Sequence, residues 1–304
     1  MTGQADLRAR LDRLGNRGPS TASAGTEGLG ELAARIARLR GRADGRAPAA
    51  PQVLAAALGG TEVAPGVVLV ERSYPLWQRI GRLPLGGLRS AVGEGLPADR
   101  ASCLFVDTET TGLAGGTGTV AWMIGVGRLG AEDFRVRQWV IAGFAGEAEM
   151  LRAVAAEPRA DDVLVSFNGK CYDLPLLAVR HRLHGLDDPW EGRSHLDLRY
   201  PLKRRHGAGL PDGRLKTMEE ALLGHRRSRD LPGAEAPRAW LSWLRGGRPG
   251  RVPDVAAHNR ADLLAMAGLC QCLAGPPGSV GKRGRRPAPE GSADVPPPVP
   301  IVVK

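Results

Sequence analysis

The order of the apolar segments between residues 99 and 273 constrains the fold of this 304-residue chain more than any other feature. Three strand-like segments come first, and a helix, a fourth strand, a second helix and a fifth strand follow. The expected strands span 103–112, 119–130, 134–142, 162–169 and 195–200, and the expected helices span 147–157, 173–185, 214–223, 237–245 and 254–273. Strands that alternate with helices in this way are typical of α/β domains. We therefore expect a mixed five-stranded sheet flanked by helices.

The residues on either side of this region differ from it in composition, because they are rich in Gly, Pro and Arg. Amphipathic spacing predicts two short basic helices near the amino terminus, at 4–14 and 29–43. We expect four segments: a basic, partly helical and flexible extension (1–58), a short β-containing leader (59–98), the main domain (99–274) and a disordered Pro/Gly-rich tail (275–304).

The net charge of +10 is concentrated on these flanks. Residues 1–98 carry 13 arginines against eight acidic residues, and residues 276–304 carry five basic against two acidic residues. The region between them is nearly neutral. A basic flank suits a polyanion such as nucleic acid, because neutralising phosphates supplies sequence-independent affinity. An arginine-rich composition that only aids solubility would look the same.

The first residues, Met-Thr-Gly-Gln-Ala-Asp, lack the apolar core of a signal peptide. No apolar stretch has the length of a membrane span. We therefore expect a cytoplasmic protein without a membrane partner.

Asp107 and Glu109 are the first candidates for chemistry. They follow the apolar residues 104–106 and, being two apart on a strand, project from the same face. Adjacent like charges are costly unless a cation compensates them, and hard divalent cations prefer oxygen ligands. The pair therefore suggests a Mg²⁺ or Mn²⁺ site, although solvated residues of a turn would show the same pattern.

Further acidic residues follow two later elements. Asp173 comes after the strand at 162–169 and begins a helix, at the strand end where sites form in such sheets. A plain helix N-cap would account for it as well. His258 and Asp262, four apart on the last helix, share one face. They could supply a metal ligand and a proton acceptor, or form only an exposed pair.

In this order and at these spacings, the three elements match the exonuclease motifs of the DEDD superfamily. The segments DTETTGL, GGTGT, FNGKCYDLPLL, HLDLRYPLKRR, LPG and HNRADLL resemble, more narrowly, the YprB-type ribonuclease H-like domain family. The resemblance covers about residues 100–273, and GVVLVERSYPLWQRIGRLPL, near 60–90, resembles a leader found in that family. It implies a ribonuclease H-like fold and a 3′→5′ exonuclease.

The resemblance also implies two divalent cations, Mg²⁺ or Mn²⁺, held by the catalytic carboxylates of Asp107, Glu109, Asp173 and Asp262. Two ions about 4 Å apart can generate a hydroxide and neutralise charge on the scissile phosphate and the leaving oxygen. His258 is the candidate general base, since imidazole titrates near neutrality. The histidine branch of the superfamily has its His five residues before the Asp, and the tyrosine branch has Tyr four before it. His258 occupies the tyrosine spacing, so it could instead only orient Asp262.

Five further residues are candidates for substrate binding: Thr110, Thr111, Gly112, Asn168 and Lys170. The first three could let the backbone approach a terminal nucleotide or form a bare turn. Asn168 contacts substrate or shapes the loop before the helix, and Lys170 meets a phosphate or is a solvated lysine. For Asp197, a structural or site-edge role is expected rather than metal ligation.

The function expected from these residues is 3′→5′ exonucleolytic hydrolysis of single-stranded nucleic acid. A ribonuclease H-like endonuclease or structure-specific nuclease with the same metal site is the first alternative. A catalytically inactive nucleic-acid-binding adaptor is the second, and the intact set of four carboxylates argues against it. The sequence does not separate RNA from DNA, because that discrimination depends on how the 2′-OH is contacted.

Overall fold

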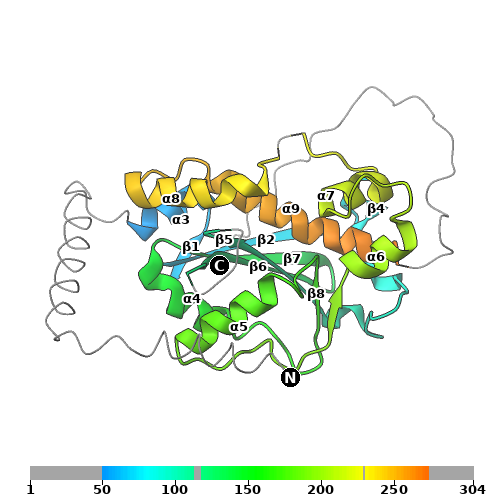
Figure 1. The fold of residues 1–304 in the computed structure, drawn as a ribbon, viewed down its shortest axis with the longest axis horizontal. Helices are drawn as coiled ribbons and strands as arrows, with labels where there is room; N and C mark the ends of the chain where they lie inside the picture. The colour runs from blue at the N-terminus through cyan, green and yellow to red at the C-terminus, as the bar shows by residue number, and fades with distance from the viewer. Residues whose placement is uncertain (1–49, 113–117, 229, 274–304) are drawn as a thin grey trace, which may run out of the picture. The chain divides into compact units, whose positions relative to one another are not determined.

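The computed structural model describes residues 50–112, 118–228 and 230–273. The helices expected at 4–14 and 29–43 and the tail expected from 275 lie outside these residues. In the described part, one mixed sheet has helices on both of its faces (Figure 1). The long helix α9 crosses one face, and α4 and α5 lie on the other (Figure 1).

The described strands are β1 (Thr61–Ala64), β2 (Val67–Pro75), β3 (Arg79–Ile80), β4 (Leu83–Pro84), β5 (Cys103–Thr110), β6 (Ala121–Leu129), β7 (Asp133–Ile141), β8 (Val163–Ser166) and β9 (His195–Asp197). The α-helices are α3 (Pro51–Leu58), α4 (Glu147–Val154), α5 (Asp173–Leu183), α6 (Arg199–His206), α7 (Leu215–Met218), α8 (Ala236–Gly246) and α9 (Val252–Cys270). Shorter turns of helix are η1 (Leu85–Ser90), η2 (Arg100–Ser102), η3 (Phe144–Gly146), η4 (Glu219–Leu223, a π-helix) and η5 (Gly233–Glu235). Across these ranges, no helix is both long and apolar enough to cross a membrane.

The sheet confirms the expected α/β class but has seven strands instead of five in the described chain, in the order β1-β2-β7-β6-β5-β8-β9. The pairs β5–β8 and β8–β9 are parallel, and the others are antiparallel. The two extra strands come from the segment expected to be a leader. β2 pairs with β7 along its whole length, from Val67 opposite Ile141 to Pro75 opposite Asp133. Its buried residues 67–70 therefore belong to the main sheet.

Two helical segments differ from the expectation. The strand expected at 195–200 ends at Asp197, and α6 begins at Arg199. Pro201 lies in the first turn of α6, where the missing N–H of a proline costs no helical hydrogen bond. The helix expected at 214–223 changes from α-helix to the π-helix η4 after Met218. Such π-helical turns are often found near functional sites.

The core fixes α8 and α9 against the sheet. On α9, Leu263 and Met266 are buried in one cluster with Phe105 and Phe134 of the sheet. On α8, the indole N–H groups of Trp240 and Trp243 donate to the carbonyl oxygens of Ile141 and Ala142, at 3.0 and 2.9 Å. Buried indole groups with satisfied N–H groups hold a helix in one orientation. Both helices are thereby set beside the carboxyl end of β5.

A buried ion pair fastens β6 to the start of β8. The Arg128 guanidinium donates two hydrogen bonds to the Asp162 carboxylate, at 2.7 and 2.6 Å. The Asp162 side chain is only 1% exposed. Burial raises the pKa of Asp162, but the hydrogen bonds from Arg128 and from the Arg159 backbone N–H outweigh it and hold the pKa below its usual value.

Asp162→Asn should lower the free energy of unfolding near neutral pH by about 3 kcal/mol, because it leaves Arg128 buried without its counterion. The folded-state pKa of Asp162 is depressed, so its ionic contribution is fully present above the unfolded value of about 4 and is lost as the pH falls through the folded value. Urea unfolding of both proteins across this range measures the difference. Asp161→Asn, at the exposed neighbour, is the control. Equal losses in the two variants, or a difference that grows toward acid pH, would contradict the assignment.

Candidate functional site

Asp107 and Glu109 lie on the face of β5 that packs against α9. Glu109 is 7% exposed and Asp107 is half-buried. The register between β5 and β6 shifts between Glu109 and Thr110, and irregularities of this kind re-aim side chains next to active sites. Both carboxylates therefore project from the end of a central strand toward the last helix, as their two-residue spacing predicts.

Asn259 of α9 holds Asp107 in place. Its fully buried Nδ2 donates to Asp107 Oδ2 at 2.7 Å and to the Asp107 carbonyl oxygen at 3.2 Å. Asn259 Oδ1 in turn accepts from Gln138 Nε2 at 2.7 Å. Gly125 lies opposite Asp107 on β6, and a Cβ atom there would stand only 2.1 Å from Asn259 Oδ1. The glycine thus makes room for the contact between α9 and Asp107.

His258 and Asp262 come from the face of α9 turned toward β5. Together with Asp107, Glu109 and Thr110 they line a hollow of about 170 Å³. Its remaining lining residues are Thr108, Gly233, Ala236 and Pro237. The i,i+4 pair on the last helix therefore meets the strand pair at one place, and its side chains are mostly buried, at 16% and 15% exposed.

Asp173, the first residue of α5, does not line this hollow but contacts β5 beside it. Its Oδ1 atom accepts hydrogen bonds from the Thr108 hydroxyl and, at 3.2 Å, from the Thr108 backbone N–H. The side chain is therefore tied to β5, and its residue is the first of α5 rather than the N-cap. Gly169 precedes it, and a Cβ atom there would stand 2.5 Å from Ser166 Oγ, so this tight loop requires glycine.

The carboxylates of the site repel one another. Burial and the charges of Asp262 and Asp173 raise the pKa values of Asp107 and Glu109 well above their usual range. Burial also raises the pKa of Asp173. Buried carboxylates in this situation take up protons or cations, and oxygen-only donors suit Mg²⁺ or Mn²⁺. In chemistry and electrostatics, the donor set fits divalent cations.

The four carboxylates do not surround one common position that a metal ion could occupy. In the described ranges, no three His, Cys, Asp or Glu side chains are grouped closely enough to hold an ion. Three of the four carboxylates are engaged by other groups: Asp107 by Asn259, Asp173 by Thr108 and Asp262 by Arg227. The charge pattern supports a metal site, whereas the side-chain positions do not form one.

A second group of charges surrounds His258 and Asp262. Asp230 Oδ1 lies 2.6 Å from His258 Nδ1, and His258 Nε2 lies 3.6 Å from Asp262 Oδ2. Arg227 Nη2 lies 2.6 Å from Asp262 Oδ1. Burial works against the charged form of Asp230, but the contacts with His258 and Arg227 hold its pKa below its usual value.

Asn259, Asp230 and Arg227 are the site neighbours that sequence reasoning missed. Asn259 lies inside the HNRAD segment and carries a signal, since an amide on the buried side of a helix needs partners. Arg227 and Asp230 belong to a charged stretch just before LPG that reads as a solvated loop. Their burial comes from tertiary packing, which no local pattern encodes.

The loop before α5 is shaped by Asp197. This buried carboxylate accepts from the backbone N–H groups of Asn168 and Lys170, at 2.7 and 3.1 Å. Asn168 has a positive φ of 70° and its Oδ1 accepts from Arg199 Nη1 at 2.5 Å. Asp197 of β9 and Asn168 thus shape the loop, whereas the Lys170 side chain is exposed.

The threonine candidates lie at the end of β5. Thr110 lines the hollow and its hydroxyl donates to the Gly112 carbonyl oxygen at 2.8 Å. Thr111 pairs with the backbone of Val120. Of the five residues expected to bind substrate, the structure brings Thr110 to the carboxylates, and Thr111, Gly112, Asn168 and Lys170 do not line the hollow.

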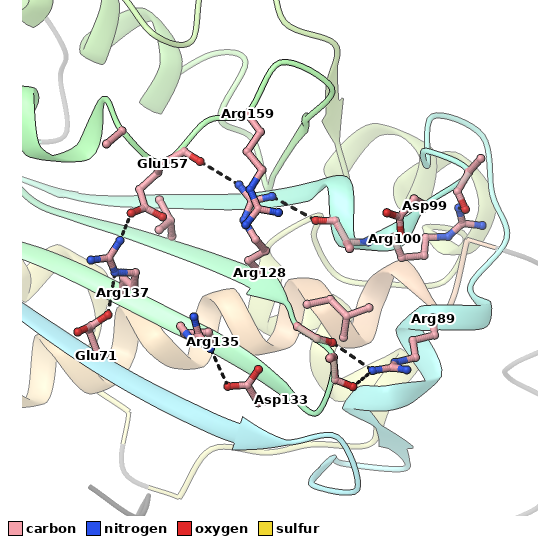
Figure 2. A pocket seen from close by; sticks show the side chains of 17 residues that line it. Glu71, Arg89, Asp99, Arg100, Arg128, Asp133, Arg135, Arg137, Glu157 and Arg159 are labelled. Carbon is pink, nitrogen blue, oxygen red and sulfur yellow. Dashed lines mark hydrogen bonds and ion pairs between the residues drawn. The ribbon is translucent and has the colours of Figure 1, made fainter. Parts of the chain in front are cut away.

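A larger hollow, of about 890 Å³, lies at the opposite end of β5, beside Arg100 and Ala101 (Figure 2). It is rich in arginine, but most of its charges are already engaged. Arg137 pairs with Glu71 and Glu157, Arg135 with Asp133, and Arg89 with backbone carbonyl oxygens (Figure 2). No candidate catalytic residue lines it. The smaller hollow is therefore the candidate site.

A protein-family model described as the RNase H superfamily (RNase_H_2) matches residues 104–274. A curated relative, the uncharacterized protein YprB of Bacillus subtilis (strain 168), is 29% identical over 205 residues, which are 66% of this chain and 47% of that protein. The chain thus spans about half the length of the curated relative it matches.

Two solved structures are also similar. The family B DNA polymerase from the hyperthermophilic archaeon Pyrobaculum calidifontis has a TM-score of 0.44 at 18% identity, over 72% of this chain and 30% of that chain. E. coli exonuclease I in complex with a dT13 oligonucleotide has a TM-score of 0.38 at 13% identity, over 56% of this chain and 40% of that chain. Because both TM-scores are below 0.5, neither similarity supports a conclusion about this chain.

Asn259→Asp should lower the free energy of unfolding by about 2–4 kcal/mol at neutral pH, because it replaces a donor 2.7 Å from Asp107 with a like charge. The exchanged pair, Asp107→Asn with Asn259→Asp, restores one donor and one acceptor and should regain most of that loss. Urea unfolding of the two single variants and the exchanged pair measures the coupling. Additive losses would show that the contact does not hold α9 to β5.

Proposed function

The chain belongs to the RNase H superfamily, and we propose that it is a metal-dependent nuclease that hydrolyses phosphodiester bonds of single-stranded nucleic acid. One observation carries the proposal: carboxylates of β5 and α9 line one hollow, and Asp173 of α5 lies within electrostatic reach of them. An acidic site repels a phosphodiester unless cations lie between them. A nuclease with this site therefore requires metal.

Asp107, Glu109, Asp173 and Asp262 would hold the cations, two Mg²⁺ or Mn²⁺ ions, through carboxylate oxygens. Bound ions lower the pKa of a water molecule and neutralise the charge that develops on the scissile phosphate and the leaving oxygen. The role of the protein is to keep the four carboxylates close together. Asn259 and Thr108 do this for Asp107 and Asp173 by donating hydrogen bonds to them.

His258 is the proposed general base. The depressed pKa of Asp230 keeps that carboxylate ionised, so it accepts a hydrogen bond and His258 Nδ1 carries the proton. In the neutral imidazole, Nε2 then has the free lone pair, and it faces Asp262 and the hollow. This geometry supports proton transfer from water to Nε2, with Asp230 orienting the ring.

Action on a single strand and from the 3′ end is the finer part of the proposal. The hollow is small against the cross-section of a duplex, which favours one strand. The order of the DTE, NGKCYD and HNRAD motifs resembles that of 3′→5′ exonucleases. An endonuclease with the same metal site and an inactive nucleic-acid-binding adaptor are separated from it by the products of the reaction.

The purified chain should shorten 5′-labelled single-stranded RNA or DNA stepwise from the 3′ end in Mg²⁺ or Mn²⁺, and not in EDTA. Asp107→Asn and Asp262→Asn each remove one anionic ligand while keeping the side-chain shape, so each should lower the rate about a hundredfold or more. Gel electrophoresis of the labelled products measures both. Asp254→Asn, 60% exposed on the same helix as Asp262, is the matched control and should keep full activity.

The products of the reaction distinguish the exonuclease from the endonuclease and the adaptor. Internal fragments that depend on metal and on Asp107 would replace the exonuclease by the endonuclease. Salt-sensitive binding without cleavage in either metal would assign the chain to the adaptors. Cleavage that survives both Asp→Asn changes would show that the site is elsewhere.

His258→Gln should lower kcat by about 10²- to 10⁴-fold and leave Mn²⁺ affinity within a few-fold of the wild-type value. Asp230→Asn should lower kcat about tenfold or more, because the ring loses the acceptor that orients it. Steady-state kinetics and isothermal titration calorimetry with Mn²⁺ separate the two roles of His258. Parallel losses of kcat and Mn²⁺ affinity would mean that His258 orients Asp262 instead of taking the proton.

A further inference from the structure

Arg227 places a buried positive charge on one of the proposed metal ligands. Its Nη2 atom lies 2.6 Å from Asp262 Oδ1 and 2.8 Å from Glu219 Oε2. Its Nη1 atom lies 3.5 Å from Asp230 Oδ1. The Arg227 side chain is only 7% exposed. One guanidinium therefore contacts three carboxylates, and the nearest of them is Asp262.

Glu219 is a second buried anion in contact with Arg227. It belongs to the π-helix η4 and its side chain is 1% exposed. His225 Nε2 lies 3.6 Å from its other oxygen, Oε1. A buried carboxylate at a distorted helical turn is costly unless it is paired, and its close cationic partner here is Arg227. Glu219 thus keeps the guanidinium at the site when its contact with Asp262 is lost.

Arg227 divides its contacts among several carboxylates. Its Nη2 atom contacts both Asp262 and Glu219, and its Nη1 atom faces Asp230. Arg128, by contrast, gives both of its Nη atoms to the single carboxylate of Asp162. Because the Arg227 side chain is only 7% exposed, little solvent screens the charge that it supplies to Asp262.

We propose that Arg227 is the resident counterion of Asp262, which neutralises this carboxylate when no divalent cation is bound and competes with the cation for it. The inference rests on the proposed function, since it requires a metal site at Asp262. Two positive groups cannot both lie close to one carboxylate oxygen in a buried site without strong repulsion. A cation that binds Asp262 must weaken or displace Arg227, which retreats toward Glu219.

Two consequences follow for the metal-free and metal-bound protein. The metal-free site is held together by Arg227, since it offsets charges that otherwise repel. The same charge lowers the affinity for divalent cations. Removing it should therefore strengthen metal binding and weaken the metal-free fold, a combination that a purely structural residue would not produce.

Arg227→Met removes the charge and keeps most of the side-chain volume. Calorimetric titration with Mn²⁺ alone should give an affinity about tenfold higher than that of the wild type. The metal-free variant should melt at a lower temperature, and saturating Mn²⁺ should raise its Tm by more than it raises the wild-type Tm. Arg226→Met, at a neighbour that is 83% exposed and forms an ion pair with Glu220, controls for the change in net charge.

A variant with Arg227→Met and Glu219→Gln together removes both partners of the buried pair and serves if the single variant fails to fold. It too should bind Mn²⁺ more tightly than the wild type. If the wild type binds Mn²⁺ and the variants lacking Arg227 bind it equally or more weakly, the counterion role is overturned and the proposed function stands. If the wild type binds no Mn²⁺ at all, the metal site of the proposed function fails, and this inference fails with it.

Discussion

Repulsion among carboxylates gathered at the end of β5 is the constraint on which the other features of the site depend. Asp107, Glu109, Asp173 and Asp262 come from three elements, and burial makes their charges costly. Without other stabilising contacts, these carboxylates would move apart toward solvent, where water screens their charges. They are instead held in place by β5, α5 and α9, so the packing of these three elements opposes the repulsion.

The neighbours of these carboxylates are explained by the same constraint. Thr108 donates a hydrogen bond to Asp173, and Asn259 donates one to Asp107. Gly125 leaves room for Asn259 to reach the strand. Arg227 adds a positive charge beside Asp262. We interpret this combination as a site that stays assembled without metal and remains short of positive charge. In the proposed function, such a site would attract divalent cations and, through them, the phosphates of a nucleic acid.

The sequence predicted the parts that local patterns encode. An apolar run followed by a two-residue spacing placed Asp107 and Glu109 on one face of a strand. The four-residue spacing on α9 placed His258 and Asp262 on one helix face, and in the structure these residues line the same hollow. The addition of β1 and β2 to the sheet was missed, because the pairing of β2 with β7 joins segments far apart in the chain and β1 is added through β2. Arg227 was missed for a related reason: its side chain is buried against Asp262 of α9 and Glu219 of η4, which lie apart from it in the chain.

The claim that these carboxylates bind divalent cations is tested most directly by diffraction from crystals of the chain soaked in Mn²⁺, at a wavelength where manganese scatters anomalously. Anomalous density is expected beside Asp107, Glu109, Asp173 and Asp262, at about 2.1 Å from their oxygens. Crystals saturated with Mn²⁺ that show no density there, or density only at other residues, would contradict the claim.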